Sequence, residues 1–220
     1  MRTVNRYRSE LDGLVQLATR DLAVLAGDVR DGRVAADLLS EVLPALSAAY
    51  GGAAGVLAAE FYETYRLEQG VSGRFSVLVA DVPPRSRTDA LARWAVAPLF
   101  TDQPDPALVL SRAGGGLQRI IADVGRETVM STSIEDPQAV GWQRVATPGG
   151  CGFCHMLAGR GAVYSKDTVQ FGAHDNCQCA AVPAFGGKPR PVKPYTPGPR
   201  QASPEDRART RKWMRENGYL

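Results

Sequence analysis

Apolar residues recur at three- and four-residue spacing over roughly the first 135 positions, which is the pattern of amphipathic helices that each bury one face. The pattern predicts a first helix that ends near Gly32 and a second helical stretch from about Val34 to Gln69. Pro44 and the glycine-rich patch at 51–55 would bend this second stretch, divide it into two helices or permit close helix contact. The first third of the chain is therefore predicted to be helical.

The pattern changes at Gly70 and then becomes helical again. A short strand is predicted at 74–80, followed by helices at 86–100 and 107–131, with Thr88 as the capping residue of the first of these. The triplet Gly114–Gly116 is expected either to break the second helix or to let another backbone approach it. The inward face of 86–100 is predicted to consist of Leu91, Trp94, Ala95 and Leu99.

Beyond Pro137 the chain has short apolar segments separated by glycine, at 140–145, in the cysteine region and at 180–185, and these are predicted to be short strands or extended segments. The proline-rich stretch 186–202 predicts an extended arm, and Ser203 begins a helix that continues to about Asn217. The fold class is therefore mainly α (α+β). We expect a helical body over 1–135, a small Cys/His-stapled α+β module over 136–185 and a Pro-rich basic arm over 186–220 that ends in a short helix.

Composition places the chain among soluble globular proteins. It has 220 residues, of which 44% are hydrophobic and 22% charged, and this excludes wholesale disorder. No uninterrupted apolar stretch approaches the roughly 18 residues of a membrane span, so we expect no membrane association. The first ten residues lack the apolar core of a secretory signal, and we therefore expect synthesis and residence in a reducing cytosol.

All four cysteines lie between Cys151 and Cys179, which is too few for a disulfide-built scaffold and calls for a local explanation. The two residues between Cys151 and Cys154 let both thiolates of a tight turn point at one centre, and His174 with Cys177 repeats that spacing. Zinc binds four such ligands in a tetrahedron. The sequence predicts a structural zinc site of Cys151, Cys154, His174 and Cys177, with Cys179 as the substitute for His174 or Cys177.

Other interpretations of these cysteines stay open at this point. They could be small buried apolar residues, form disulfides outside the cell, or act as a redox pair, although the strand–helix context of a thioredoxin-like motif is missing. A nucleophile pair is a further alternative, with Cys154 or Cys177 attacking and His155 or His174 as base. Only Asp175 is near enough in sequence to orient such a base, so we expect no catalytic residues.

Positive charge is concentrated in the arm, where residues 186–220 carry a net charge of +6 although the whole chain carries only +3. A tryptophan lies among these basic residues, which is costly to leave in water and useful in an interface. We expect this cluster to bind DNA or an acidic face of a neighbouring protein; otherwise it is a solvated terminus. The predicted partner-binding residues are Arg207, Arg209, Arg211, Lys212, Trp213 and Arg215.

The motifs of the C-terminal third resemble the signature of Mu F-like minor head proteins of tailed bacteriophages. Trp142–Val145 is followed by Cys151–Ala158, then Gly161–Tyr164, and then His174–Cys179 with Val182–Pro183. The resemblance covers residues 140–185 and implies a low-copy structural protein of the phage head, associated with the portal vertex during head assembly or DNA packaging. It implies the portal protein or the major capsid protein as partners, and a location in the virion head, with the host cytoplasm during assembly.

Two other functional classes compete with this interpretation. Similar proteins encoded after the portal are sometimes labelled capsid maturation proteases, which would require a cysteine nucleophile or a catalytic metal with an open position. A free DNA-binding module would depend on residues 203–217 and lose affinity steeply with salt. We expect a structural protein and not an enzyme.

Overall fold

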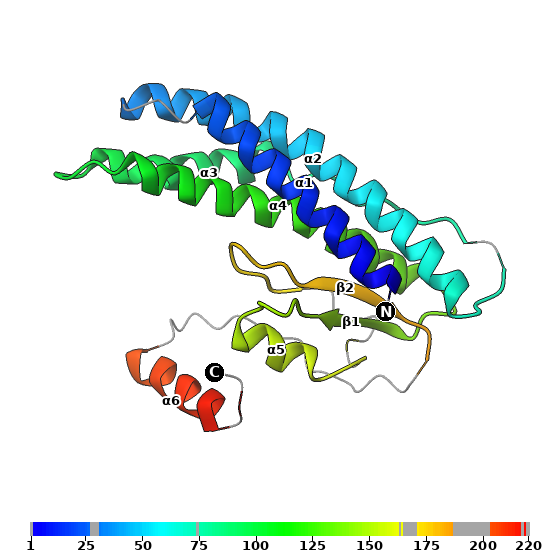
Figure 1. The fold of residues 1–220 in the computed structure, drawn as a ribbon. Helices are drawn as coiled ribbons and strands as arrows, with labels where there is room; N and C mark the ends of the chain where they lie inside the picture. Colours follow the sequence, from blue (N-terminus) through cyan, green and yellow to red (C-terminus); the bar gives the residue numbers. More distant parts are fainter. Residues whose placement is uncertain are drawn as a thin grey trace.

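The structure is a computed structural model that describes residues 2–26, 31–73, 75–162, 164, 171–186, 203–216 and 218. Within the last helix, the side chains at positions 206, 207, 210 and 213 lie outside the described part. The chain is mainly α-helical with one small sheet, as predicted from the sequence. Figure 1 shows four helices packed lengthwise above that sheet.

The helical body has α2 at its centre, in contact with α1, α3 and α4. Its elements are α1 (Arg2–Ala26), α2 (Gly32–Glu68), α3 (Arg85–Val96), the 3-10 turn η1 (Ala97–Phe100) and α4 (Pro106–Glu135). Asp31 caps α2 by accepting hydrogen bonds from two backbone N–H groups. Asp105 caps α4 by accepting one from Leu108 N, and Pro106 occupies the first turn. These caps explain where both helices begin.

The second helical stretch is one helix and not two, because α2 continues through Pro44. The glycines of α2 do not break the helix; they allow another segment of the chain to approach it closely. A Cβ on Gly55 would lie 2.6 Å from a methyl carbon of Val79, and a Cβ on Gly51 would lie 2.8 Å from one of Val82. The segment that follows α2 therefore lies directly against the helix at these positions.

The prediction of a strand at 74–80 is wrong, because residues 75–84 form no strand; Arg74 lies outside the described residues. The backbone of this segment binds side chains of α4 instead of another strand. Ala80 N donates to Thr128 Oγ1 at 3.0 Å, and Thr132 Oγ1 donates to the Leu78 carbonyl at 3.4 Å. The alternating apolar residues pack on helices, which the sequence pattern alone does not distinguish from pairing in a sheet.

Two details of the α3–α4 region also differ from prediction. Thr88 is not the cap of α3, because it lies inside the helix and donates to the Arg85 carbonyl. Trp94 is 46% exposed and stacks under the Arg112 guanidinium at 4.8 Å instead of facing inward. The glycine triplet does not break α4; a Cβ on Gly116 would lie 2.3 Å from a Leu91 methyl carbon, so α3 and α4 are in close contact there.

The two predicted C-terminal strands are confirmed as β1 (Gly141–Val145) and β2 (Ala180–Ala184), which pair antiparallel with Val145 opposite Ala180. The cysteine region between them contains a short helix, α5 (Gly152–Ala158), where short strands or extended segments were expected. The sheet lies between the helical body and α5 (Figure 1). Trp142 of β1 is fully buried between the rings of Tyr164 and Phe171, with centroids 4.3 and 5.6 Å away.

A buried ion pair joins the end of α2 to the end of α4. Arg66 Nε donates to Asp136 Oδ2 at 2.9 Å, and the Tyr62 hydroxyl approaches the same oxygen at 3.2 Å. The Arg66 guanidinium also donates to the carbonyls of Ser72 and Gly73. This network fixes the point at which the chain leaves the helical body for β1.

The predicted C-terminal helix is confirmed as α6 (Pro204–Glu216), whereas the extended arm predicted at 186–202 lies outside the described residues except for Gly186. The expectation that nothing in the chain matches a membrane span needs correction. By length and composition α2 is apolar enough to cross a membrane, with mean hydropathy 1.5 over 18 residues, of which 39% are buried. In this structure its apolar faces pack against α1, α3 and α4.

Candidate metal centre

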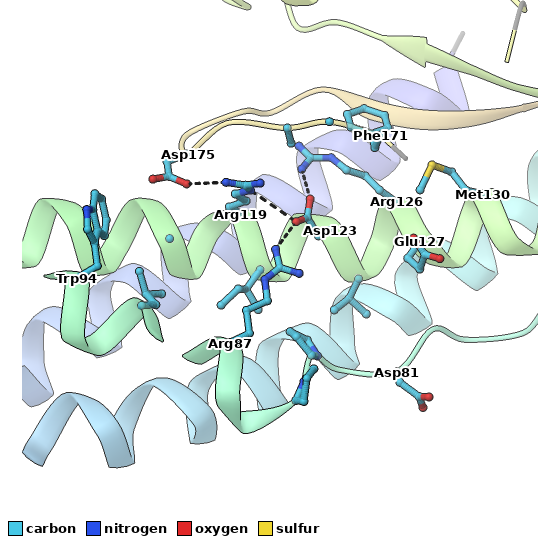
Figure 2. Close-up of a pocket in the computed structure, with 18 residues that line it drawn as sticks. Asp81, Arg87, Trp94, Arg119, Asp123, Arg126, Glu127, Met130, Phe171 and Asp175 are labelled. Atoms are coloured by element: carbon cyan, nitrogen blue, oxygen red, sulfur yellow. Dashed lines mark hydrogen bonds and ion pairs between the residues drawn. The ribbon is translucent and has the colours of Figure 1, made fainter. Parts of the chain in front are cut away.

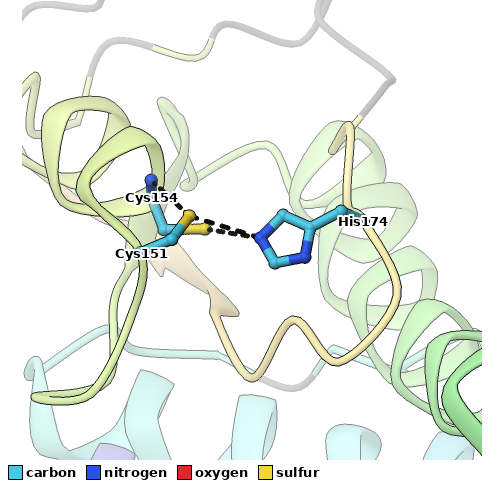
Figure 3. A group of neighbouring side chains, drawn as sticks. All are labelled: Cys151, Cys154 and His174. Carbon is cyan, nitrogen blue, oxygen red and sulfur yellow. Dashed lines mark hydrogen bonds between the residues drawn. The ribbon is translucent and has the colours of Figure 1, made fainter. Parts of the chain in front are cut away.

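The first two cysteines are positioned by the start of α5. Cys151 is the N-cap residue, and its sulfur accepts a hydrogen bond from the Cys154 backbone N–H at 3.4 Å. A capping residue and the third helical residue lie on the same side of the first turn, so both thiols face one point (Figure 3). This is the local reason for the Cys-x-x-Cys spacing.

The other ligands come from a turn that precedes β2. Cys177 N donates to the His174 carbonyl at 3.2 Å, and Asn176 closes the turn with a φ of 63°. Asparagine is among the few residues that adopt this left-handed conformation readily. His174 Nδ1 lies 2.7 Å from the Asp175 carbonyl, and donation there fixes the tautomer and leaves Nε2 free to coordinate a metal.

These two segments bring the predicted ligand atoms together. His174 Nε2 lies 3.3 Å from Cys151 Sγ and 3.7 Å from Cys154 Sγ, as Figure 3 shows, and Cys154 Sγ lies 3.8 Å from Cys177 Sγ. Zinc–sulfur bonds of about 2.3 Å in a tetrahedron place ligand atoms about 3.7 Å apart. Each of these three separations is therefore close to that expected between two ligands of one ion.

We call the five side chains Cys151, Cys154, His174, Cys177 and Cys179 the Cys/His cluster. It consists of two overlapping groups, one of Cys151, Cys154 and His174 and one of Cys154, Cys177 and Cys179, each with its ligand atoms within 4.8 Å of one another. Cys154 belongs to both groups and is the centre of the arrangement. All four cysteines are free thiols, so no disulfide links them. The Cys/His cluster could hold a metal ion.

The thiols differ strongly in acidity. The Cys179 thiol beside Cys177, together with the charge of Arg126, lowers the pKa of Cys177 to about 4 despite its burial. Burial raises the pKa of Cys154 to about 11, and the neighbouring Cys177 raises the pKa of Cys179. One thiolate is therefore present at neutral pH before any metal binds, which favours capture of a soft cation.

Two buried arginines hold the segment that carries three of these ligands, residues 171–179, which we call the ligand loop. Arg126 of α4 donates to the carbonyls of Cys177 at 2.6 Å and Cys179 at 2.9 Å. Arg144 of β1 donates to the carbonyls of Phe171 and Gly172. Both guanidinium groups also lie over the Phe171 ring, at 4.7 and 3.7 Å from its centroid. They connect the ligand loop to the core and place positive charge beside the thiolates.

The sequence motifs did not reveal these arginines. Their only signal is that each interrupts an apolar stretch, Arg126 on the buried face of α4 and Arg144 in β1. A charged residue at a buried position needs partners, and here the partners are backbone carbonyls of the ligand loop.

The nucleophile alternative finds a close pair but no catalytic arrangement. Of the predicted nucleophile–base pairs, Cys154 Sγ lies 3.7 Å from His174 Nε2, yet His174 Nδ1 faces a backbone carbonyl and not a carboxylate. The Asp175 carboxylate instead pairs with Arg119 at 3.5 Å. The redox alternative lacks its context as well, since the described strands form a two-stranded antiparallel sheet.

One cavity lies away from the thiols. It measures about 840 Å³ and runs between α3, α4 and the ligand loop, where Arg87 and Arg126 both pair with Asp123 (Figure 2). No cysteine lines it. A smaller cavity of about 490 Å³ lies between α1 and α4 and reaches Cys177.

The predicted partner-binding residues lie on α6. Arg209, Arg211, Lys212 and Arg215 have exposed side chains, and Lys212 approaches Glu216 at 3.8 Å. The side chains of Arg207 and Trp213 lie outside the described part of the chain.

Comparison with known families gives the chain its affiliation. The model of the family described as VG15 protein matches residues 1–202. The chain belongs to this family. It is therefore a viral protein, which agrees with the viral origin that the resemblance in the C-terminal third implied. No curated protein and no solved structure matches the chain.

Proposed function

We propose that this VG15 family member is a structural component of the phage head whose C-terminal module is stapled by one zinc ion. The observation that carries the proposal is the number of ligands. Five candidate ligands lie in two overlapping groups that share Cys154, and a tetrahedral ion needs four of them. A catalytic zinc keeps one position open for water, whereas a site with a surplus of protein ligands leaves none.

The fold around the Cys/His cluster explains what the zinc would do. The ligand loop and α5 lie outside the large helical core, and their connection to it is a two-stranded sheet, Trp142 and two arginines. A small module of this kind gains much of its stability from a metal that ties its segments together. The ion acts as a cross-link and takes part in no reaction.

The helical body offers a surface for assembly. Several segments with exposed apolar side chains meet at the end of the body where α1 ends, α2 and α4 begin and η1 lies (Figure 1). A Cβ on Gly32 would lie 2.8 Å from the Phe100 ring, so the start of α2 and η1 are in contact at this end. Clusters of this kind mark protein interfaces. Its members are Val24, Leu25, Val34, Trp94, Phe100 and Leu108.

We infer that this end docks onto the portal protein or the major capsid protein, with the chain residing in the virion head and, during assembly, in the host cytoplasm. The exposed basic side chains of α6 suit contact with packaged DNA or with an acidic face of a neighbouring head protein. Family membership and the motif order at 140–185 support this role.

Copurification tests the role. A tagged chain is expressed in infected cells, and both assembling heads and finished virions are isolated and probed for it. We expect the chain in both, together with portal protein, and we expect Phe100→Ser to weaken the association while the exposed Leu67→Ser, at the other end of α2, does not. Absence from heads and virions would contradict the proposal.

The alternative, a capsid maturation protease, makes a different prediction for Cys151, the most exposed cysteine of the Cys/His cluster and the one in contact with His174. A protease with Cys151→Ser would yield intact particles with unprocessed shell protein. A structural role predicts normal processing of the shell protein in particles that carry the variant chain, because four candidate ligands remain.

A further inference from the structure

The smaller cavity, between α1 and α4, has features that the metal centre and the docking role do not use. We call it the α1–α4 cavity. It has a volume of about 490 Å³ and is closed on its third side by the loop that precedes α5 and by the ligand loop. Its polar lining includes Asn5, Arg8, Ser9, Asp12, Gln118, Arg126, Thr147 and Gln178.

Two of these polar side chains have no partner among the described residues. Gln118 is only 7% exposed, lines the cavity, and makes no hydrogen bond in the described part of the chain. Arg8 also lines it, with its Nε atom buried and unbonded and no acidic group in ion-pair range among those residues. A buried guanidinium Nε atom without a partner is costly, and together with the free Gln118 amide it indicates a ligand that satisfies both groups.

The other charged groups of the cavity already have partners. Arg126 pairs with Asp123 at 2.8 Å and donates to the ligand loop. Both oxygens of Asp12 accept hydrogen bonds from neutral amides, one from Gln16 at 2.8 Å and one from Gln178 at 3.2 Å. This leaves Arg8 as the charged group without a partner among the described residues, with the negative charge of Asp12 nearby.

The charges of Arg8 and Asp12 indicate which kind of ligand fits the cavity. One free guanidinium matches a single negative charge, and the nearby Asp12 carboxylate disfavours a phosphate dianion. The planar guanidinium fork fits a carboxylate, and the Gln118 N–H group adds a further donor. The rest of the lining is apolar and comes from Leu11, Val15, Ala122 and Pro148.

We propose that the α1–α4 cavity is a binding site for a carboxylate carried on an aliphatic body. The carboxylate accepts hydrogen bonds from Arg8 and Gln118, and the aliphatic part packs against the apolar wall of α1 and α4. The carboxylate belongs either to a small free acid or to the end of a peptide chain, which share this chemistry.

Ligand titration of the full-length protein, followed by two-dimensional NMR or by thermal shift, tests the proposal. Hexanoate is the probe, and hexan-1-ol and inorganic phosphate serve as comparisons of equal chain length and of different charge. We expect saturable binding of hexanoate with shifts at residues that line the cavity, and binding of hexan-1-ol and phosphate weaker by at least about 10-fold, because one charge-assisted hydrogen-bonded pair is lost. Equal binding of hexanoate and hexan-1-ol, or no binding of hexanoate, would overturn it.

A matched pair of arginine variants keeps the test independent of general charge effects. Arg8→Gln removes the free guanidinium, while Arg6→Gln removes an exposed arginine of the same helix that already pairs with Glu10. We expect Arg8→Gln to weaken hexanoate binding by about 10-fold or more and Arg6→Gln to leave it unchanged. An equal effect of both variants would overturn the assignment.

A dipeptide, N-acetyl-alanyl-leucine, separates the two sources of the carboxylate. Tighter binding of this peptide than of hexanoate would support a chain terminus as the ligand, and tighter binding of hexanoate would support a free acid. Loss of head association would leave these titrations interpretable, since they are made on the purified protein.

Discussion

Arg126 connects the helical body to the ligand loop, and one substitution at this residue removes its hydrogen bonds to the loop. The substitution Arg126→Met keeps the length of the side chain and its apolar stem but removes every hydrogen-bond donor. Arg126 is 1% exposed and supplies the carbonyls of Cys177 and Cys179 with their donors. Without it, two carbonyls that now bond to a guanidinium lose that partner.

The cost follows from these contacts. Each carbonyl that loses its donor costs about 1–3 kcal/mol, and the buried cation–π contact with Phe171 adds about 1–2 kcal/mol. The methionine side chain recovers part of this through apolar packing, while Asp123 keeps its pairing with Arg87. We expect the free energy of unfolding to fall by about 3–5 kcal/mol.

Denaturant unfolding of the metal-loaded protein, followed by tryptophan fluorescence, measures this loss. The control is Arg119→Met on the same helix, because Arg119 has a side chain that is 42% exposed and ion pairs of 3.5–3.8 Å at the surface. Such pairs contribute at most about 1 kcal/mol. A loss for Arg126→Met no larger than for Arg119→Met would refute the view that Arg126 anchors the ligand loop.

Three further predictions concern the helical body. Asp136→Leu should lower the free energy of unfolding by about 3–5 kcal/mol in denaturant titrations, because it leaves a buried guanidinium without its carboxylate. Gly116→Ala should lower the free energy of unfolding by about 1–3 kcal/mol, since its Cβ would lie 2.3 Å from Leu91. Gly52→Ala should raise it by about 0.5–1 kcal/mol, because the space around Gly52 is open. Equal effects of the two variants would contradict the close packing at Gly116. Backbone N–H groups lower the pKa of Asp31, so its stabilising contribution should be present above the unfolded pKa and disappear as the pH falls through the lower folded pKa. Asp31→Asn should flatten the acidic part of the pH profile of thermal unfolding.

The sequence predicted the elements whose signals are local. Helical periodicity located α2 and α4, the capping pattern at Ser203 located α6, and the Cys-x-x-Cys and His-x-x-Cys spacings identified residues of the Cys/His cluster. The two spacings were informative because each pair, Cys151 with Cys154 and His174 with Cys177, lies in a single turn. Within one turn, the separation in sequence largely determines the separation in space.

The features that the sequence did not predict depend on tertiary contacts. The apolar alternation at 74–80 suggested a strand, but its neighbours are the glycines of α2 and the threonines of α4, and no local pattern encodes them. Trp94 was expected inside, yet it lies on the surface against Arg112. Arg126 and Arg144 serve the ligand loop from positions far away in sequence. Burial of an arginine becomes interpretable only when its acceptors are known.

The most direct test of the central claim is X-ray absorption spectroscopy of protein purified under reducing conditions and loaded with one equivalent of zinc. The account predicts one tightly bound zinc per chain, with three or four sulfur ligands at about 2.3 Å, the remainder nitrogen and no water oxygen, and a marked fall in thermal stability after chelation. A chain that binds no zinc, or that keeps its full stability when the metal is removed, would contradict it.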